Sequence, residues 1–265
     1  MCSGAESAPV QSPPPPPAPA ATNSEALKAE SDFSGAELPL EYHAEIKRQF
    51  TNRGSPQESS RTTLRLEYTP DGPFTLYRVD IPFVDKKNGD PGDPGLGDIK
   101  TRMDLHPFAA GATELGFFEE TTFPSANPKS LGNGKYQLGL GAEQMIPIAA
   151  LSSPQTAPKW STTFTPLLEQ TFSVAGDASF PPINYTKLEL ALKTSWRRTV
   201  SLKLNPKFTF DWVGGEDSGA VIELEPSWNI TRRWNFSVTL GHGMFGVGVP
   251  GTYNRKIEWD LQFSF

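Results

Sequence analysis

The amino-acid sequence predicts an all-β fold: a transmembrane, antiparallel up-and-down β-barrel of about twelve strands. Three observations predict it. Apolar and polar residues alternate in about twelve segments after Pro39, the links between these segments are alternately short and long, and most of the six tryptophans fall near segment ends. Alternation with a period of two indicates a strand with one apolar and one polar face. A membrane barrel needs no stronger signal, because half of each strand faces a polar interior.

The composition agrees with such a barrel. The chain has 265 residues, enough for one large all-β domain. Hydrophobic residues make up only 37% of it, and no run approaches the ~20 apolar residues of a membrane helix. The net charge of -6 argues against nucleic acid as a partner. Cys2 is the only cysteine, which excludes an internal disulfide and a thiolate metal site.

The amino-terminal segment differs from the rest of the chain. Residues 1–38 are rich in Pro, Ala and Ser, and we expect a disordered periplasmic tail there, followed by a barrel over residues 39–265. The tail has no basic n-region and no apolar h-region, so it contains no signal peptide. Because an outer-membrane protein must be exported, we expect the mature form with Met1 added. Cys2 then resembles the lipid-bearing first residue of a bacterial lipoprotein; the alternative is an incidental cysteine near an artificial start.

The first expected strands combine alternation with turn residues at their ends. The clearest pattern belongs to the fourth, where Ile99 and Met103 alternate with Lys100 and Arg102. The first is the weakest, because its second half is polar apart from Phe50. These four strands are expected at residues 40–51, 61–69, 73–84 and 97–106.

The remaining expected strands follow the same pattern. Leu188 and Leu190 alternate with Lys187 and Glu189, and Leu202 and other apolar residues alternate with lysines one strand later. The eight strands are expected at residues 112–123, 135–148, 161–174, 185–195, 199–212, 219–229, 233–243 and 254–265.

The links give an independent argument for a barrel. Links from even to odd strands are mostly tight, such as Pro70-Asp71-Gly72, whereas those from odd to even strands are longer and richer in Gly and Pro. Outer-membrane barrels have short periplasmic turns and long outer loops, so we place the short links and both termini in the periplasm. Only the 149–160 link is an exception, because it joins an even to an odd strand and is nevertheless long.

The positions of the tryptophans also agree with a barrel, because tryptophans favour membrane interfaces. Trp160, Trp196, Trp228 and Trp234 fall near periplasmic strand ends, and Trp212 falls near an outer one.

The polar faces of the strands are crowded with charge. A Lys or Arg facing hydrocarbon at mid-membrane would cost ~2–4 kcal/mol, so we expect these side chains to line the lumen. There they must pair or be hydrated. A wide aqueous channel and a narrow pore closed by ion pairs both remain open; the mixed signs favour a narrow or partly gated pore over a strongly ion-selective one. The expected lumen-lining residues are Arg65, Glu67, Arg78, Asp80, Lys100, Arg102, Asp104, Lys187, Glu189, Lys203, Lys207, Glu223, Glu225, Lys256, Glu258 and Asp260.

The last segment ends the chain on an aromatic residue of its apolar face. Trp259, Leu261, Phe263 and Phe265 share that face. This ending resembles the assembly signal of bacterial outer-membrane β-barrels. The resemblance implies recognition by the barrel-assembly machinery and a location among outer-membrane lipids.

Short motifs in the middle of the chain resemble a known family. Gly95-Leu96-Gly97-Asp98 precedes the fourth segment, and Phe123-Pro124 and Gly132-Asn133-Gly134 follow. This order resembles the outer-membrane family known as the meta-pathway of phenol degradation, or as transporters, over roughly residues 60–265. Ser125 and Ala126 stand where that family has Thr-Gly. The resemblance implies a channel or transporter for small solutes, including hydrophobic or aromatic compounds, without catalytic residues or cofactors.

Two other function classes remain open. A lipid-anchored barrel could be a structural or accessory lipoprotein in an envelope complex, with the Pro-rich tail as spacer. A phospholipase-like enzyme would need a serine beside a histidine. Near an outer rim, His242 is followed by Met244 and Phe245 rather than a serine, and His43 and His106 are better explained as wall or turn residues.

The sequence predicts no metal centre. No three-ligand metal spacing is present. Asp90, Asp93 and Asp98 could hold a weakly bound calcium ion, but Asp-Gly and Asp-Pro are ordinary turn formers.

Overall fold

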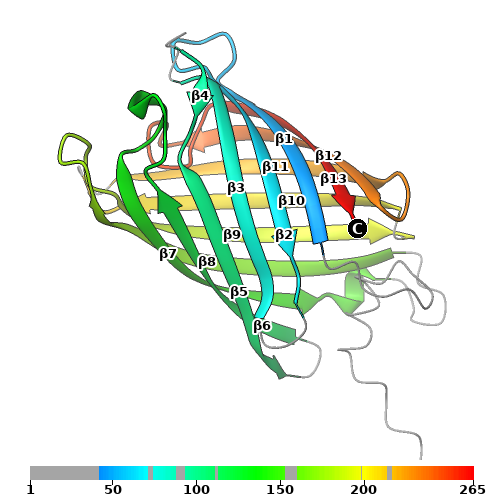
Figure 1. Ribbon diagram of the computed structural model, residues 1–265. Helices are drawn as coiled ribbons and strands as arrows, with labels where there is room; N and C mark the ends of the chain where they lie inside the picture. The colour runs from blue at the N-terminus through cyan, green and yellow to red at the C-terminus, as the bar shows by residue number, and fades with distance from the viewer. Residues whose placement is uncertain are drawn as a thin grey trace, which may run out of the picture.

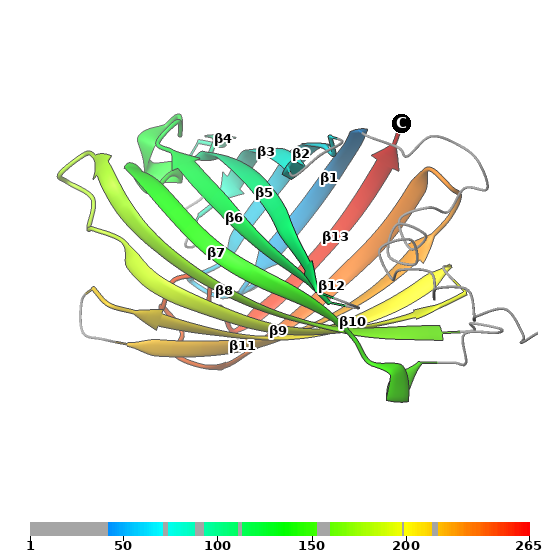
Figure 2. The ribbon, with the colours of Figure 1, turned by 90° about the horizontal axis from the view of Figure 1, so that it is seen from below.

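The computed structural model describes residues 42–70, 74–87, 93–110, 113–152, 160–197, 199–213 and 217–265. These residues form a closed antiparallel barrel of twelve long strands, with the two-residue strand β4 paired beside β3. Figure 1 shows the barrel wall, and Figure 2 shows it from below. The tail expected over residues 1–38, including Cys2, lies outside the described residues.

The strands account for most of the described residues, and two 3-10 turns, η1 and η2, lie in links. In the described part of the chain, no helix is long and apolar enough to cross a membrane. The elements are β1 (Tyr42–Thr51), β2 (Ser59–Tyr68), β3 (Phe74–Lys86), β4 (Gly95–Leu96), β5 (Ile99–Ala110), β6 (Thr113–Phe123), η1 (Lys129–Leu131), β7 (Lys135–Pro147), η2 (Ala149–Leu151), β8 (Trp160–Gly176), β9 (Asn184–Trp196), β10 (Val200–Asp211), β11 (Ser218–Asn229), β12 (Trp234–Phe245) and β13 (Arg255–Ser264).

The barrel closes because β1 pairs with both β2 and β13. Its register with β13 runs from His43 opposite Ser264 to Thr51 opposite Lys256. Main-chain hydrogen bonds in both directions between Tyr42 and Phe265 continue this pairing to the end of the chain. Apart from β4, every other strand pairs with its neighbours in the chain, which confirms the predicted up-and-down topology.

All twelve predicted segments are strands, and the main differences lie where β-bulges interrupt the alternation. β5 runs to Ala110 rather than ending at His106, and β3 runs to Lys86. The register shifts between Leu105 and Phe108 on β5, and between Ser60 and Arg61 opposite the end of β3. A bulge adds an unpaired residue and breaks the period of two, so alternation alone predicts an end too early.

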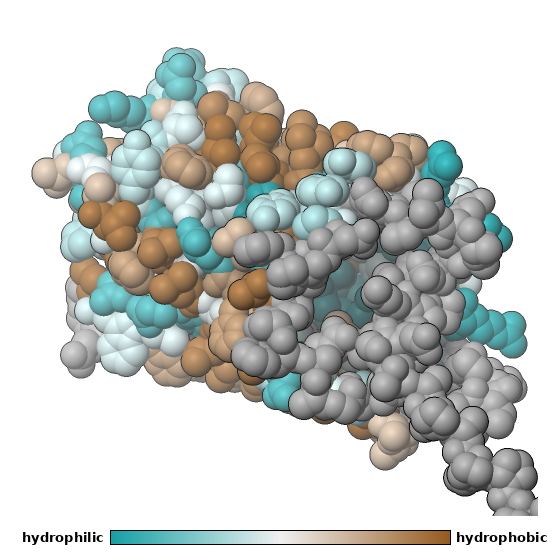
Figure 3. Space-filling view, turned by 60° about the horizontal axis from the view of Figure 1, so that its bottom comes forward, coloured by the Kyte–Doolittle hydropathy of each residue, from teal (hydrophilic) through white to brown (hydrophobic). Residues whose placement is uncertain are grey.

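The side chains are distributed in the opposite way to those of a water-soluble sheet protein. Most buried residues are polar or charged, such as Glu169 at 4% exposure, whereas large hydrophobic residues such as Leu168 reach 54%. Figure 3 shows broad hydrophobic areas on the wall. An apolar exterior around a polar interior is the arrangement of a membrane-spanning barrel.

Aromatic side chains form a belt around the end of the barrel that holds the short links. Trp160 lies opposite Trp196, and Trp228 and Trp234 lie at the same ends of their strands. Val200 lies opposite both Trp196 and Trp228, so the register places these tryptophans at one level, as predicted. Such a belt marks a membrane–water interface. Ring contacts extend the belt through Tyr77, Tyr68, Tyr42, Phe265, Phe263 and Trp234.

Candidate functional site: the charged inner wall

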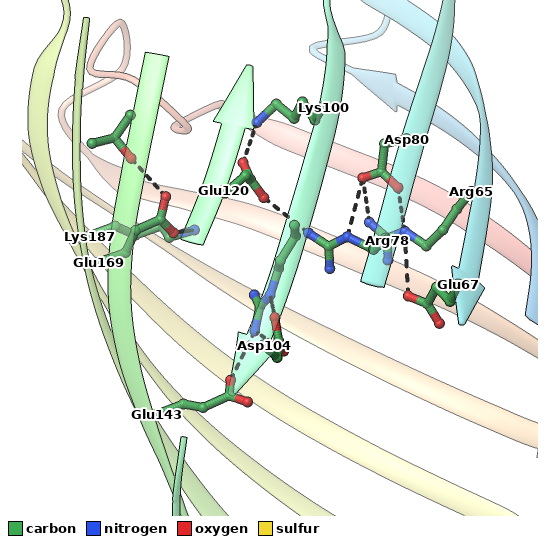
Figure 4. Close-up of polar contacts among 12 residues, drawn as sticks. Arg65, Glu67, Arg78, Asp80, Lys100, Asp104, Glu120, Glu143, Glu169 and Lys187 are labelled. Atoms are coloured by element: carbon green, nitrogen blue, oxygen red, sulfur yellow. Dashed lines mark hydrogen bonds and ion pairs between the residues drawn. The ribbon is translucent and has the colours of Figure 1, made fainter. Parts of the chain in front are cut away.

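The register places the charged faces of neighbouring strands side by side. Arg65 on β2 lies opposite Asp80 on β3, and Lys100 on β5 lies opposite Asp80 from the other side. Figure 4 shows Arg65 and Asp80 pointing toward one another and Lys100 pointing toward Glu120, with the strands of the far wall behind them. The ion pairs of this face form two large clusters, a smaller group around Arg102 and the separate pair of Lys203 with Glu225.

The first cluster, which we call the β1–β6 cluster, begins at the seam between β1 and β13. Lys47 Nζ lies 3.1 Å from Glu45 Oε1 and 3.8 Å from Asp260 Oδ1. Glu45 Oε2 in turn lies 3.5 Å from Arg65 Nη1. Arg65 donates two hydrogen bonds to Asp80, over 2.6 and 2.8 Å. This bidentate pair fixes both side chains in one geometry.

Glu120 on β6 continues the β1–β6 cluster. Its two carboxylate oxygens accept hydrogen bonds from Arg78 Nη2 at 3.0 Å and from Lys100 Nζ at 2.8 Å. The contact between Arg78 and Glu120 joins β3 to β6 across the intervening strand β5. Side chains that reach over a neighbouring strand project into the barrel, so the Arg78–Glu120 contact lies inside it.

Arg102 forms a smaller group of ion pairs beside the β1–β6 cluster. It donates two hydrogen bonds to Asp104, over 2.6 and 2.8 Å, and its Nη2 lies 3.5 Å from Glu143 Oε2 on β7. Its guanidinium also lies 3.9 Å from the centre of the Phe118 ring. Stacking and bidentate pairing together suit an arginine and not a lysine.

The second cluster, the β8–β13 cluster, is a chain in which each lysine bridges two carboxylates. Lys203 and Glu225 form a separate pair at 2.5 Å. In the chain of bridges, each buried charge is compensated by its neighbours. Removing one member would leave a charge of the opposite sign unpaired and cost about 3–5 kcal/mol. The bridges are Glu169–Lys187–Glu189, Glu189–Lys207–Glu223 and Glu223–Lys256–Glu258, with N–O distances from 2.6 to 3.5 Å.

The loop between β12 and β13 reaches this cluster from the long-loop end. Tyr253 is 6% exposed and donates a hydrogen bond to Glu223. Its ring and main chain lie so close to Gly241 and Gly243 that a side chain at either position would clash with them. Burial, reinforced by the carboxylate of Glu223, raises the pKa of Tyr253 well above its usual range, which keeps the hydroxyl protonated. Sequence reasoning missed this contact, because it depends on how the loop between β12 and β13 folds.

The Gly-Leu-Gly-Asp motif has a structural role at the long-loop end. Asp98 accepts hydrogen bonds from the main-chain N–H of Asn133 at 2.5 Å and of Ala126 at 3.3 Å. A side chain at Gly95 would clash with the main chain of Asn127, and one at Gly132 with Asp98 itself. The motif therefore fastens the 124–134 loop to the barrel. Because its carboxylate oxygens accept these N–H groups, Asp98 is better explained as a loop anchor than as a calcium ligand.

The acidic residue Glu119 faces outward, on the apolar side of β6. Glu119 on β6 shares its face with Phe117 and Phe123, and it lies opposite Met103 and Leu140 on the adjacent strands. Its carboxylate accepts a hydrogen bond from Thr121 at 3.1 Å. The sequence pattern of β6 is enough to predict this outward position, because Glu119 occupies one of the alternate positions that otherwise hold apolar residues such as Phe117 and Phe123. It borders a shallow outer hollow of about 470 Å³ lined mainly by Tyr42, Leu66, Tyr68, Tyr77, Val79 and Met103.

The structure describes the side chains of two histidines, His43 at the seam and His242 on β12. His43 Nδ1 lies 2.7 Å from Ser264 Oγ at the seam, but its cross-strand neighbour Glu67 is not hydrogen-bonded to it. His242 is exposed opposite Arg255, and the described residues give it no hydrogen-bond partner. The side chain of His106 lies outside the described part of the structure.

The expected assembly-signal residues face outward at the seam. The ring of Phe263 lies 4.7 Å from that of Trp234 and 5.8 Å from that of Phe265, measured between ring centres. Phe265 also stacks on Tyr42 at 5.8 Å. Trp259 and Leu261 lie on the same face, opposite Val238 and Phe236 of β12. These residues therefore contribute to barrel closure as well as to any recognition signal.

Solved structures with this architecture include outer-membrane channels. An outer membrane channel from Pseudomonas putida F1 is similar with a TM-score of 0.62 and 14% identity, over 88% of this chain and 100% of that one. The NanC porin is similar with a TM-score of 0.57 and 7% identity, over 84% of this chain and 98% of that one. At these identities the likeness shows the barrel fold. No protein-family model and no curated protein sequence matches the chain.

Proposed function

We propose that the protein is an outer-membrane channel or transporter for small solutes. The observation that carries this proposal is the inner wall: a closed barrel whose inward-facing side chains are charged and joined by ion pairs. A polar interior of this kind admits water and solutes where a barrel filled with apolar side chains would not. Likeness to solved outer-membrane channels supports the location and the transport class.

We propose that the end with the short links and the chain terminus faces the periplasm. Short turns and long loops are divided between the two ends as in outer-membrane barrels. The tail before Tyr42 would then start in the periplasm, and the barrel-assembly machinery would meet Phe265 there. A lipid on Cys2 would add a second membrane anchor, and an accessory role among envelope proteins would depend on that tail.

We propose a narrow passage whose selectivity depends on individual residues rather than on net charge. Twelve strands lie between the filled eight-stranded barrels and the open sixteen-stranded porins. Cations and carboxylates alternate along both clusters, so neither sign dominates the wall. Such a wall suits small solutes that exchange hydrogen bonds with both signs of charge. The motif resemblance to the phenol meta-pathway family suggests aromatic compounds bearing polar groups as the first solutes to test.

The test is single-channel recording in planar bilayers with the purified full chain. Discrete openings are expected, and their ion selectivity is expected to shift toward anions in Glu120→Gln and toward cations in Lys100→Gln. The two variants change opposite members of one ion pair, so each is the control for the other. Absence of openings in correctly folded protein would contradict a channel. A change of ion selectivity in the same direction in both variants would contradict a passage along this wall.

A further inference from the structure

Basic side chains gather on the outer face of the barrel at its long-loop end. Arg48 and Arg53 lie over the same aromatic ring: their guanidinium carbons are 4.7 and 5.8 Å from the centre of Phe50. Arg48 shares the outward parity of Ile46 and Phe50 on β1. Arg255 begins β13 directly beside them. We call Arg48, Arg53 and Arg255 the rim patch.

Main-chain contacts hold the rim patch together across the seam. Asn52 donates a hydrogen bond from its main-chain N–H to the carbonyl oxygen of Arg255 over 2.8 Å. Its side-chain Oδ1 accepts from the main-chain N–H of Asn254 at 2.7 Å and of Arg255 at 3.3 Å. The loop that carries Arg53 is thereby fastened to the start of β13, which places Arg53 and Arg255 on one rim.

Carboxylates balance part of the positive charge of the rim patch, since Asp85 pairs with Arg48 and Glu58 lies close enough to Arg53 to interact with its charge. Arg48 pairs with Asp85 and donates a hydrogen bond to Thr62 at 2.8 Å. Arg53 and Arg255 are exposed and form no ion pair with any residue that the structure describes. Unpaired guanidinium groups next to a membrane are suited to bidentate contact with phosphate.

The wall next to the rim patch is apolar. Ile46, Leu240, Ile257 and Trp259 face outward there with exposures from 38% to 48%. Cations at the rim and apolar side chains immediately toward the middle of the wall match the two parts of a phosphorylated lipid. The aromatic belt at the opposite end has no such guanidinium pair over one ring among the described residues.

We infer that the rim patch binds a lipid phosphate of the outer leaflet, with Arg53 and Arg255 contacting the phosphate and the apolar wall contacting the acyl chains. Arg48, held by Asp85, supports the Phe50 ring on which Arg53 lies. The inference rests on the membrane orientation proposed above, but not on an open passage through the barrel.

The test titrates the purified full chain in detergent with diphosphorylated lipid A and follows binding by native mass spectrometry. We expect dephosphorylated lipid A to bind about tenfold or more weakly than the diphosphorylated form. The double variant Arg53→Gln/Arg255→Gln is expected to lose the same factor, whereas the matched variant Arg197→Gln/Arg233→Gln, which removes two exposed arginines from the opposite end, should bind like the parent chain.

Three outcomes would overturn the inference. Equal binding of the two lipid A forms would show apolar contact alone. Unchanged binding by Arg53→Gln/Arg255→Gln would place the phosphate elsewhere. Displacement by inorganic phosphate at millimolar concentration would indicate a free-anion site and not a lipid site. Single-channel currents of the same variant separate this test from the proposed function, because the rim patch lies outside the barrel and its loss should leave the conductance unchanged.

Discussion

The hydroxyl of Tyr253 donates a 2.5 Å hydrogen bond to Oε1 of Glu223, the same carboxylate that pairs with Lys207 and Lys256. Tyr253 belongs to the loop between β12 and β13, whereas Glu223 lies within β11. The contact therefore ties a loop at the long-loop end to the ion pairs inside the barrel.

Replacing Tyr253 with Phe should destabilise the barrel by about 1.5–3 kcal/mol, because a hydrogen bond to a charged acceptor is lost while the ring remains. The measurement is the free energy of unfolding by denaturant in detergent. Tyr136→Phe is the control, since Tyr136 is exposed on the outer face. Equal losses in the two variants would contradict a specific role for the Tyr253 hydroxyl.

The contribution of Tyr253 should also depend on pH in one direction only. Its pKa is raised in the folded protein, so its stabilisation is fully present below the unfolded pKa of about 10 and decreases as pH rises above that value. The difference in unfolding free energy between the parent chain and Tyr253→Phe should be flat up to about pH 9 and then shrink. If this difference in unfolding free energy shrinks already near neutral pH, at about pH 6 to 8, a group other than Tyr253 controls the loop.

Replacing Glu119 with Leu should stabilise the barrel in a lipid bilayer. Its carboxylate faces outward beside Met103 and Leu140, where a charged carboxylate costs about 1–2 kcal/mol or more in hydrocarbon. The measurement is folding free energy in vesicles. Glu143→Leu is the control and should destabilise the barrel, because it removes a partner of Arg102 inside the barrel. Destabilisation by Glu119→Leu would indicate that a protein partner covers this face.

Replacing Asp98 with Ala should loosen the 124–134 loop without opening the barrel. Two main-chain N–H groups lose their acceptor, at a local cost of about 1–3 kcal/mol. Hydrogen exchange at Ala126 and Asn133 should become faster, while that of β6 and β7 stays unchanged. Asp93→Ala, at an exposed position before the motif, is the control. Unchanged exchange at Asn133 would contradict the anchoring role.

Replacing Phe265 with Ala should slow insertion into the outer membrane. The residue is expected to be read by the barrel-assembly machinery, and it also stacks on Tyr42 and Phe263. Unassisted refolding into detergent separates the two roles. A defect in cells with normal refolding in detergent supports recognition. Slow refolding in both settings would show that Phe265 acts mainly by closing the barrel.

The strands and their inward faces were predictable because alternation and link length depend on local sequence. The bulges of β3 and β5 were not, since an extra residue at Asp85 or near Pro107 leaves no mark in composition. The ion pairs were also out of reach: that Glu120 meets Arg78 depends on the register of three strands. Tyr253 was missed because loops follow no period, whereas Glu119 could have been found from its parity alone.

The hydrogen bonds between Tyr42 and Phe265 place the first described residue of the wall beside the last residue of the chain. The ring of strands therefore has no preferred starting point in space. A circular permutant that joins Phe265 to Tyr42 through a short linker, and opens the chain between Ser55 and Pro56 in the β1–β2 loop, would keep every strand pair. Such a protein would carry its ends on the opposite side of the membrane, ready for display of a fused peptide.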